Sequence, residues 1–134
     1  MEMTGSVLAG LMAMLGLAAD PALIVLARYD TDFGPLVLER HPVTGDVGGY
    51  YESYNGLITG HSNSTGAITA HWVQDQSDRA CATERLGSLH WGRVEWSVQA
   101  NGTLSGRWSY CDEALTAARA WNGTHRTGTL FPAR

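Results

Sequence analysis

Gly102-Thr103-Leu104-Ser105-Gly106-Arg107-Trp108 is one of four copies of a heptapeptide pattern that decides the fold of this 134-residue chain. In each copy a glycine, an apolar residue and a small residue stand two positions apart, and in three copies an aromatic residue follows two positions later. A period of two places all of these positions on one face of a β-strand. The other copies occupy residues 45–51, 56–62 and 66–72.

The shared face alternates small and large residues, which is typical of the inside of a small β-barrel. Turn signals mark the strand ends, and two of them are the dipeptides Asn55-Gly56 and Asn101-Gly102. Asn-Gly between two alternating runs is a strong hairpin signal. Together these patterns predict eight strands, over residues 23–29, 36–40, 47–53, 57–62, 67–73, 92–99, 103–110 and 121–127.

Eight strands joined mostly by short turns favour an all-β fold, an eight-stranded antiparallel up-and-down barrel. Closure into a barrel removes the exposed edges that an open sheet would leave. The length fits a single domain, which we place over residues 20–134. An apolar, signal-like helix is expected to precede it.

Residues 1–19 contain an uninterrupted apolar run at 7–19 that is too short to span a bilayer but suits the core of a signal peptide. Gly16-Leu17-Ala18 offers a cleavage site with small residues. The segment before the run contains Glu2 and no positive charge, which departs from the usual signal peptide. We favour export to the periplasm or the cell exterior; the alternative is an ordinary buried helix or a packed N-terminal segment in a cytoplasmic protein.

The charge balance narrows the classes of partner. The formal net charge is −4 and the chain contains no lysine. This balance gives no electrostatic reason to bind nucleic acid, and the absence of lysine excludes Schiff-base chemistry on this chain. No transmembrane segment is predicted, and the sequence does not indicate an oligomeric state.

Two cysteines, Cys81 and Cys111, are compatible with either compartment. In an up-and-down barrel the long connections 74–90 and 111–120 emerge at the same mouth, and they carry both cysteines. In an exported protein we expect a Cys81–Cys111 disulfide. In the cytosol they would be two thiols without the spacing of a redox motif.

Five tryptophans are many for so short a chain. Trp72, Trp96 and Trp108 occupy inward positions, and we expect Trp72 and Trp108 to fill the barrel, because eight strands leave little room inside. Trp91 and Trp121 are expected at the mouth, together with His90. These three are candidate ligand-binding residues, with the tryptophans stacking on an apolar or sugar-like molecule.

Catalytic and metal motifs are not evident. The histidines lack the spacing of a metal site, no G-x-S-x-G elbow is present, and no cofactor is indicated. The acidic residues at the mouth, among them Asp112 and Glu113, are expected to be solvated charges paired with arginines. A hydrolase that uses Asp112 or Glu113 is the least favoured alternative.

Residues 29–126 resemble a widespread group of small exported bacterial β-barrel domains without an established activity. The matching marks include Thr31-Asp32-Phe33-Gly34-Pro35, Trp91-Gly92-Arg93 and Trp121-Asn122-Gly123-Thr124. The resemblance implies a fold and no particular chemistry.

The stretch 45–53 is more distantly similar to the third strand of avidin and streptavidin, which are calycin-like barrels. That resemblance implies that Tyr51 and Ser53 contact a ligand, as the corresponding residues contact the ureido oxygen of biotin. Thr31 and Pro35 stand where the family has asparagine and serine. Tyr51 and Ser53 therefore join the candidate ligand-binding residues.

The sequence thus predicts an exported binding or structural module that is not an enzyme, with any small ligand held at the barrel mouth. A ligand barrel requires a cavity of about 300 Å³ or more. The alternative is a filled barrel that acts through its outer surface in cell-envelope protein interactions.

Overall fold

The computed structural model describes residues 25–128. The predicted signal peptide, residues 1–19, and the apolar helix expected there lie outside the described residues. Within the described range, no helix has the length and apolar character needed to cross a membrane.

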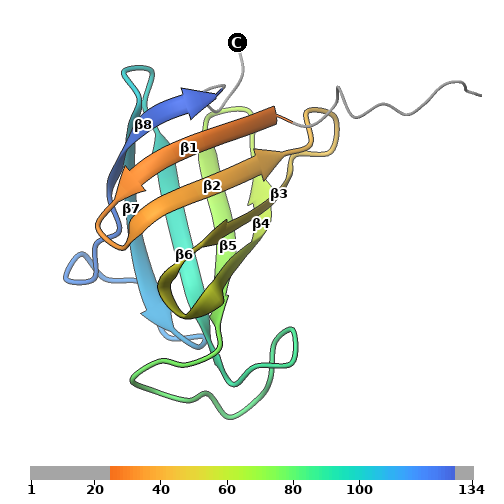
Figure 1. The fold of residues 1–134 in the computed structure, drawn as a ribbon, viewed down its shortest axis with the longest axis vertical. Coiled ribbons are helices and arrows are strands. Elements are labelled where there is room, and N and C mark those ends of the chain that lie inside the picture. Colours follow the sequence, from red (N-terminus) through yellow and green to blue (C-terminus); the bar gives the residue numbers. More distant parts are fainter. Residues whose placement is uncertain (1–24, 129–134) are drawn as a thin grey trace, which may run out of the picture.

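Eight antiparallel strands close into a barrel in which consecutive strands pair and the last strand pairs with the first (Figure 1). This confirms the predicted all-β, up-and-down barrel. A short 3-10 turn, η3 (Ser53–Asn55), separates the third strand from the fourth. The strands are β1 (Val25–Thr31), β2 (Gly34–Arg40), β3 (Asp46–Tyr51), β4 (Gly56–Ser62), β5 (Ala67–Gln74), β6 (His90–Val98), β7 (Thr103–Tyr110) and β8 (Gly123–Gly128).

Several strand ends at one end of the barrel differ from the prediction by two residues. β1 ends at Thr31 instead of residue 29, β2 begins at Gly34 instead of residue 36, and β6 begins at His90 instead of residue 92. β3 ends at Tyr51 instead of residue 53, because Tyr54 and Asn55 adopt left-handed backbone angles, with φ of 49° and 55°. These angles reverse the chain tightly into β4. β8 begins at Gly123 instead of residue 121, since the preceding segment joins β7 by isolated hydrogen bonds.

That segment completes the closure of the barrel between β7 and β8. The two strands pair at only two positions, Thr103 with Thr124 and Leu104 with Gly123. Beyond them the backbone N–H of Trp121 donates to the carbonyl oxygen of Gly106 at 2.9 Å. The connection 111–122 therefore acts as part of the barrel wall.

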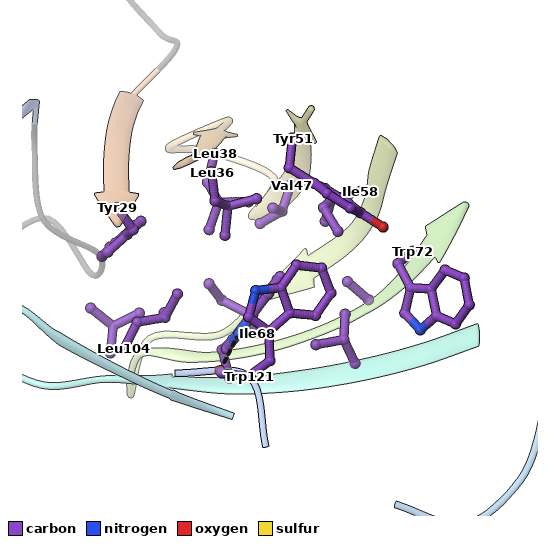
Figure 2. Close-up of a cluster of buried hydrophobic side chains, with 14 of the residues drawn as sticks. Tyr29, Leu36, Leu38, Val47, Tyr51, Ile58, Ile68, Trp72, Leu104 and Trp121 are labelled. Carbon is purple, nitrogen blue, oxygen red and sulfur yellow. Dashed lines mark hydrogen bonds between the residues drawn. The ribbon is translucent and has the colours of Figure 1, made fainter. Parts of the chain in front are cut away.

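The inward positions of the heptapeptide copies form the core, as the period of two predicts. Figure 2 shows these apolar side chains meeting between opposite walls of the barrel. Ile58, Ile68 and Leu104, each from a different copy, are at most 1% exposed. The other buried members of this cluster are Ala27, Tyr29, Leu36, Leu38, Val47, Tyr51, Ala70, Trp72, Val94, Trp96, Val98 and Trp121.

The glycines of the pattern make room for the large rings. A Cβ atom at Gly106 would overlap the indole of Trp96, the residue that pairs with it across β6 and β7. A Cβ atom at Gly56 would overlap the phenol ring of Tyr51, its partner across β3 and β4. The small positions are therefore filled by the neighbouring strand's aromatic side chain, and the middle of the barrel is packed.

Replacement of Gly106 by alanine should lower the free energy of unfolding by about 1–3 kcal/mol, because the tightly packed Trp96 ring would have to move. Gly48 is the matched control, since the nearest atom to a Cβ there is the carbonyl oxygen of Ile58 at 3.9 Å. Gly48→Ala should change stability by no more than about 0.5 kcal/mol. Urea unfolding of both variants tests this, and equal losses would contradict it.

Candidate functional site

Four connections meet at one end of the barrel, which we call the mouth. They span residues 32–33, 52–55, 75–89 and 111–122. They lie together because antiparallel strands alternate in direction, so every second connection emerges at the same end. The connections at the opposite end are short turns. The longer, chemically varied segments are thus gathered at the mouth, as predicted (Figure 1).

The mouth opens into a pocket of about 190 Å³. Most of its exposed lining is apolar, and its polar members are Ser53, Gln74, Ser77 and Asp78. Six aromatic residues contribute to the walls: Phe33, Tyr54, Trp72, Trp108, Tyr110 and Trp121. The barrel is therefore neither hollow throughout nor filled throughout, because a packed body ends in an open aromatic pocket.

The aromatic rings stand nearly perpendicular to one another. The rings of Trp72 and Trp108 meet at 79° with their centroids 6.0 Å apart, and those of Trp108 and Tyr110 meet at 82° with centroids 5.0 Å apart. Across the pocket, Phe33 and Trp121 meet at 81° with centroids 5.1 Å apart. Edge-to-face packing of this kind is favourable for aromatic pairs, and it holds the rings as angled walls instead of a stack.

A hydrogen-bonded pair lies beside these rings. The buried Tyr51 hydroxyl donates to the side-chain oxygen of Gln74 at 2.7 Å, and the Gln74 amide donates to the carbonyl oxygen of Gln76 at 2.8 Å. Burial raises the pKa of Tyr51 above its usual value, so the phenol stays protonated as a donor. This chain fixes the orientation of the Gln74 amide at the pocket.

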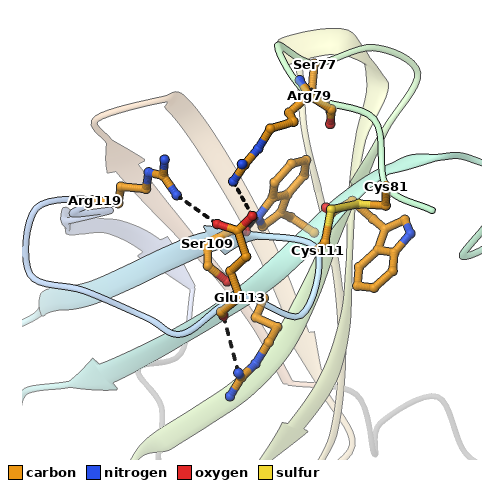
Figure 3. A network of polar contacts seen from close by, with 10 residues as sticks. Ser77, Arg79, Cys81, Ser109, Cys111, Glu113 and Arg119 are labelled. Carbon is orange, nitrogen blue, oxygen red and sulfur yellow. Dashed lines mark hydrogen bonds and ion pairs between the residues drawn. A yellow bond between two sulfur atoms is a disulfide. The ribbon is translucent and has the colours of Figure 1, made fainter. Parts of the chain in front are cut away.

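A disulfide between Cys81 and Cys111 fastens the connection 75–89 to the start of the connection 111–122, directly after β7 (Figure 3). The predicted pairing is confirmed. The bridge packs with Val73 and Trp91 in a small second cluster, apart from the barrel core. Because Ser77 and Asp78 belong to the same connection, the disulfide also restrains two residues of the pocket wall.

An ion-pair network reinforces this attachment. The carboxylate of Glu113 forms ion pairs with Arg79, from the connection 75–89, and with Arg119, from its own connection (Figure 3). Both guanidinium groups also lie over the ring of Tyr110, with Cζ to centroid distances of 4.8 and 4.9 Å. The network thus holds the two long connections together outside an aromatic wall of the pocket.

The structure brings together some of the predicted site residues. Ser53 and Trp121 line the pocket, and Tyr51 lies against Trp121 with ring centroids 5.1 Å apart. His90 and Trp91 do not line it. The Ser77 hydroxyl donates to the Arg79 carbonyl oxygen at 2.8 Å, and it shares a second hydrogen bond of 2.8 Å with Nδ1 of His90. His90 therefore positions a pocket residue.

Trp91 lies on the outer side of the barrel wall. Its indole N–H donates to the carbonyl oxygen of Thr83 at 2.7 Å, and its ring packs beside Cys81. The alternation of side chains along β6 predicts this outward position, because Trp91 lies an odd number of residues from the inward-facing Val94 and Trp96. The tryptophan is buried under the disulfide-linked connection and does not face the pocket.

Trp72 and Trp108, expected to fill the barrel, also line the pocket. The direction of the strands is the feature of the sequence that could have predicted this position at the mouth. β3, β5 and β7 run toward the mouth, so the final aromatic residue of each heptapeptide copy, Tyr51, Trp72 or Trp108, falls near that end. The fourth copy lies on β4, which runs away from the mouth, and it ends in Ser62 instead.

His71 faces the outside of the barrel near the same connection. Its ring meets that of Trp91 at 68°. Partial burial lowers the pKa of His71, and the positive charges of Arg85 and Arg93 lower it further, while Asp112 opposes them. Asp112 is thus part of an outer charge cluster and does not line the pocket.

Within residues 25–128 no group of three or more histidine, cysteine or acidic side chains is arranged to hold a metal ion. Comparison of the chain with family models, with curated proteins and with solved structures finds no match. The geometry of the mouth is therefore the ground for any functional conclusion.

Removal of the disulfide should destabilise the protein substantially. The bridge closes a loop across a sequence separation of 30 residues, so its loss should cost about 3–4 kcal/mol in the chain-entropy model. Urea unfolding of the Cys81→Ala/Cys111→Ala double variant measures this. Dithiothreitol provides the control, since it should destabilise the wild type and leave the double variant unchanged; an effect on both would contradict the assignment.

Proposed function

We propose that this protein binds a small organic molecule in the aromatic pocket at the barrel mouth. The observation that carries the proposal is the gathering of six aromatic side chains around one open pocket, in a barrel whose body is packed. Aromatic rings offer large apolar surfaces at little entropic cost. Phe33 and Tyr54 are 41% and 54% exposed at the mouth, and a bound ligand would cover them.

The size of the pocket limits the ligand. A volume of about 190 Å³ lies below the ~300–1,000 Å³ typical of sites for drug-sized molecules. The packed core beneath leaves no room for a long chain to enter the barrel. The ligand is accordingly a compact molecule, or the compact end of a larger one.

A few polar groups give the pocket its means of orienting a ligand. Ser53 and Ser77 contribute hydroxyl groups, and Gln74 contributes an amide whose orientation Tyr51 sets. Apolar walls with a small number of polar groups are typical of small-molecule sites. We do not extend the proposal to biotin, because the Tyr51 hydroxyl is engaged by Gln74.

The interactions and positions of the carboxylates at the mouth favour a binding function over a catalytic one. Glu113 is engaged by two arginines, and Asp112 interacts with His71 outside the pocket. A hydrolytic pair would require two carboxyl groups facing the same bound substrate. Asp78 is the one acidic side chain among the pocket-lining residues, so a paired mechanism lacks support.

Titration of the tryptophan fluorescence against a metabolite panel tests the proposal. A ligand should change the emission of the wild type, and Phe33→Ala should weaken its binding at least tenfold, because the side chain is 41% exposed and contacts Trp108 and Trp121. Tyr50→Ala is the matched control, since Tyr50 is an exposed aromatic residue outside the pocket. An equal loss in both variants, or no response to a broad panel, would argue against the proposal.

We also propose that the protein is exported to an oxidising compartment, the periplasm or the cell exterior. The support is the Cys81–Cys111 disulfide, because such bonds persist mainly outside the cytosol. N-terminal sequencing of the protein isolated from its source should give a start near Ala19. An intact Met1 would contradict cleavage of a leader.

A further inference from the structure

The charge of the protein is concentrated at the mouth. The four mouth connections carry seven acidic residues and three arginines, which leaves four net negative charges, the same value as the whole chain. The three turns at the opposite end contain no acidic residue or arginine. A surface with a net negative charge attracts ligands of the opposite sign. The mouth therefore favours the approach of a cation and disfavours an anion.

The lining of the pocket agrees in sign with this field. It includes the carboxylate of Asp78 and no arginine. Its tryptophan, tyrosine and phenylalanine rings carry partial negative charge on their faces, which attracts cations. An anion would meet the same ring faces with no positive side chain in the lining to offset them.

The aromatic wall already engages cations from its own chain. The guanidinium of Arg119 lies 5.3 Å from the ring centroid of Trp108, and that of Arg79 lies 4.8 Å from the centroid of Tyr110. Both arginines are paired with Glu113, so their charge is partly neutralised. Among the residues that the structure describes, no arginine lies over the rings of Phe33, Trp72 or Trp121.

From these observations we infer that the ligand of the mouth pocket is a small organic cation, such as a methylated or quaternary ammonium compound. This inference rests on the proposed function and names its ligand class. Six aromatic side chains and the carboxylate of Asp78 line the same pocket, so a compact charged group bound there would lie among both. A methylated ammonium group suits such a pocket because it is compact, weakly hydrated and apolar on its surface.

The experiment compares choline with 3,3-dimethyl-1-butanol, a neutral isostere in which carbon replaces the charged nitrogen. Isothermal titration calorimetry on the disulfide-intact protein at low ionic strength should give at least tenfold tighter binding of choline. Added salt should weaken the binding of choline and leave that of the isostere unchanged. Equal affinities, or tighter binding of the isostere, would overturn the inference and leave the proposed function intact.

Asp78→Asn locates the charge effect. This substitution should weaken the binding of choline about fivefold and leave the binding of the isostere unchanged. Asp46→Asn is the matched control, because it removes the same charge from an exposed residue at the opposite end of the barrel. Equal effects of the two substitutions would overturn the role of the mouth carboxylate. Failure of both probes to bind would overturn the cation inference. The fluorescence titration against a metabolite panel tests the proposed function separately.

Discussion

The structure depends on the fit between glycine positions and aromatic rings on the inner face of the barrel. Eight strands enclose too little space for a large side chain at every inward position. Gly56 and Gly106 each leave the space that a ring from the adjacent strand occupies, Tyr51 and Trp96 respectively. This pairing lets the barrel close around a packed body. The same pairing fixes where the rings stand, and so determines what remains open.

The pocket follows from the direction of the strands. Strands that run toward the mouth end their copies of the pattern in an aromatic residue, and the strand that runs away ends its copy in Ser62. The aromatic rings consequently accumulate at one end, where the two long connections are held by the disulfide and by Glu113. One alternation in the sequence thus gives both the core and the lining of the candidate site.

Much of the fold, and the pairing of the two cysteines, could be predicted from the sequence. The period of two located β7 at its observed bounds, Thr103–Tyr110, and the up-and-down order placed both cysteines at one mouth. The membership of the pocket was harder to predict. Phe33 and Tyr54 lie in turns, where no alternation shows which way a side chain points. The position of Trp91 beneath a long connection depends on the path of that connection, which has no periodicity to read.

The indole N–H groups provide the most direct test that the body is packed and the mouth open. The indoles of Trp72, Trp91, Trp96 and Trp121 donate to acceptors in the protein, whereas that of Trp108 has none among residues 25–128. Hydrogen exchange followed by NMR should show slow exchange for the buried Trp96 indole, which donates to the carbonyl oxygen of Trp121 at 3.0 Å, and fast exchange for the Trp108 indole. Exchange of Trp96 as fast as that of Trp108 would show water throughout the barrel and contradict the account.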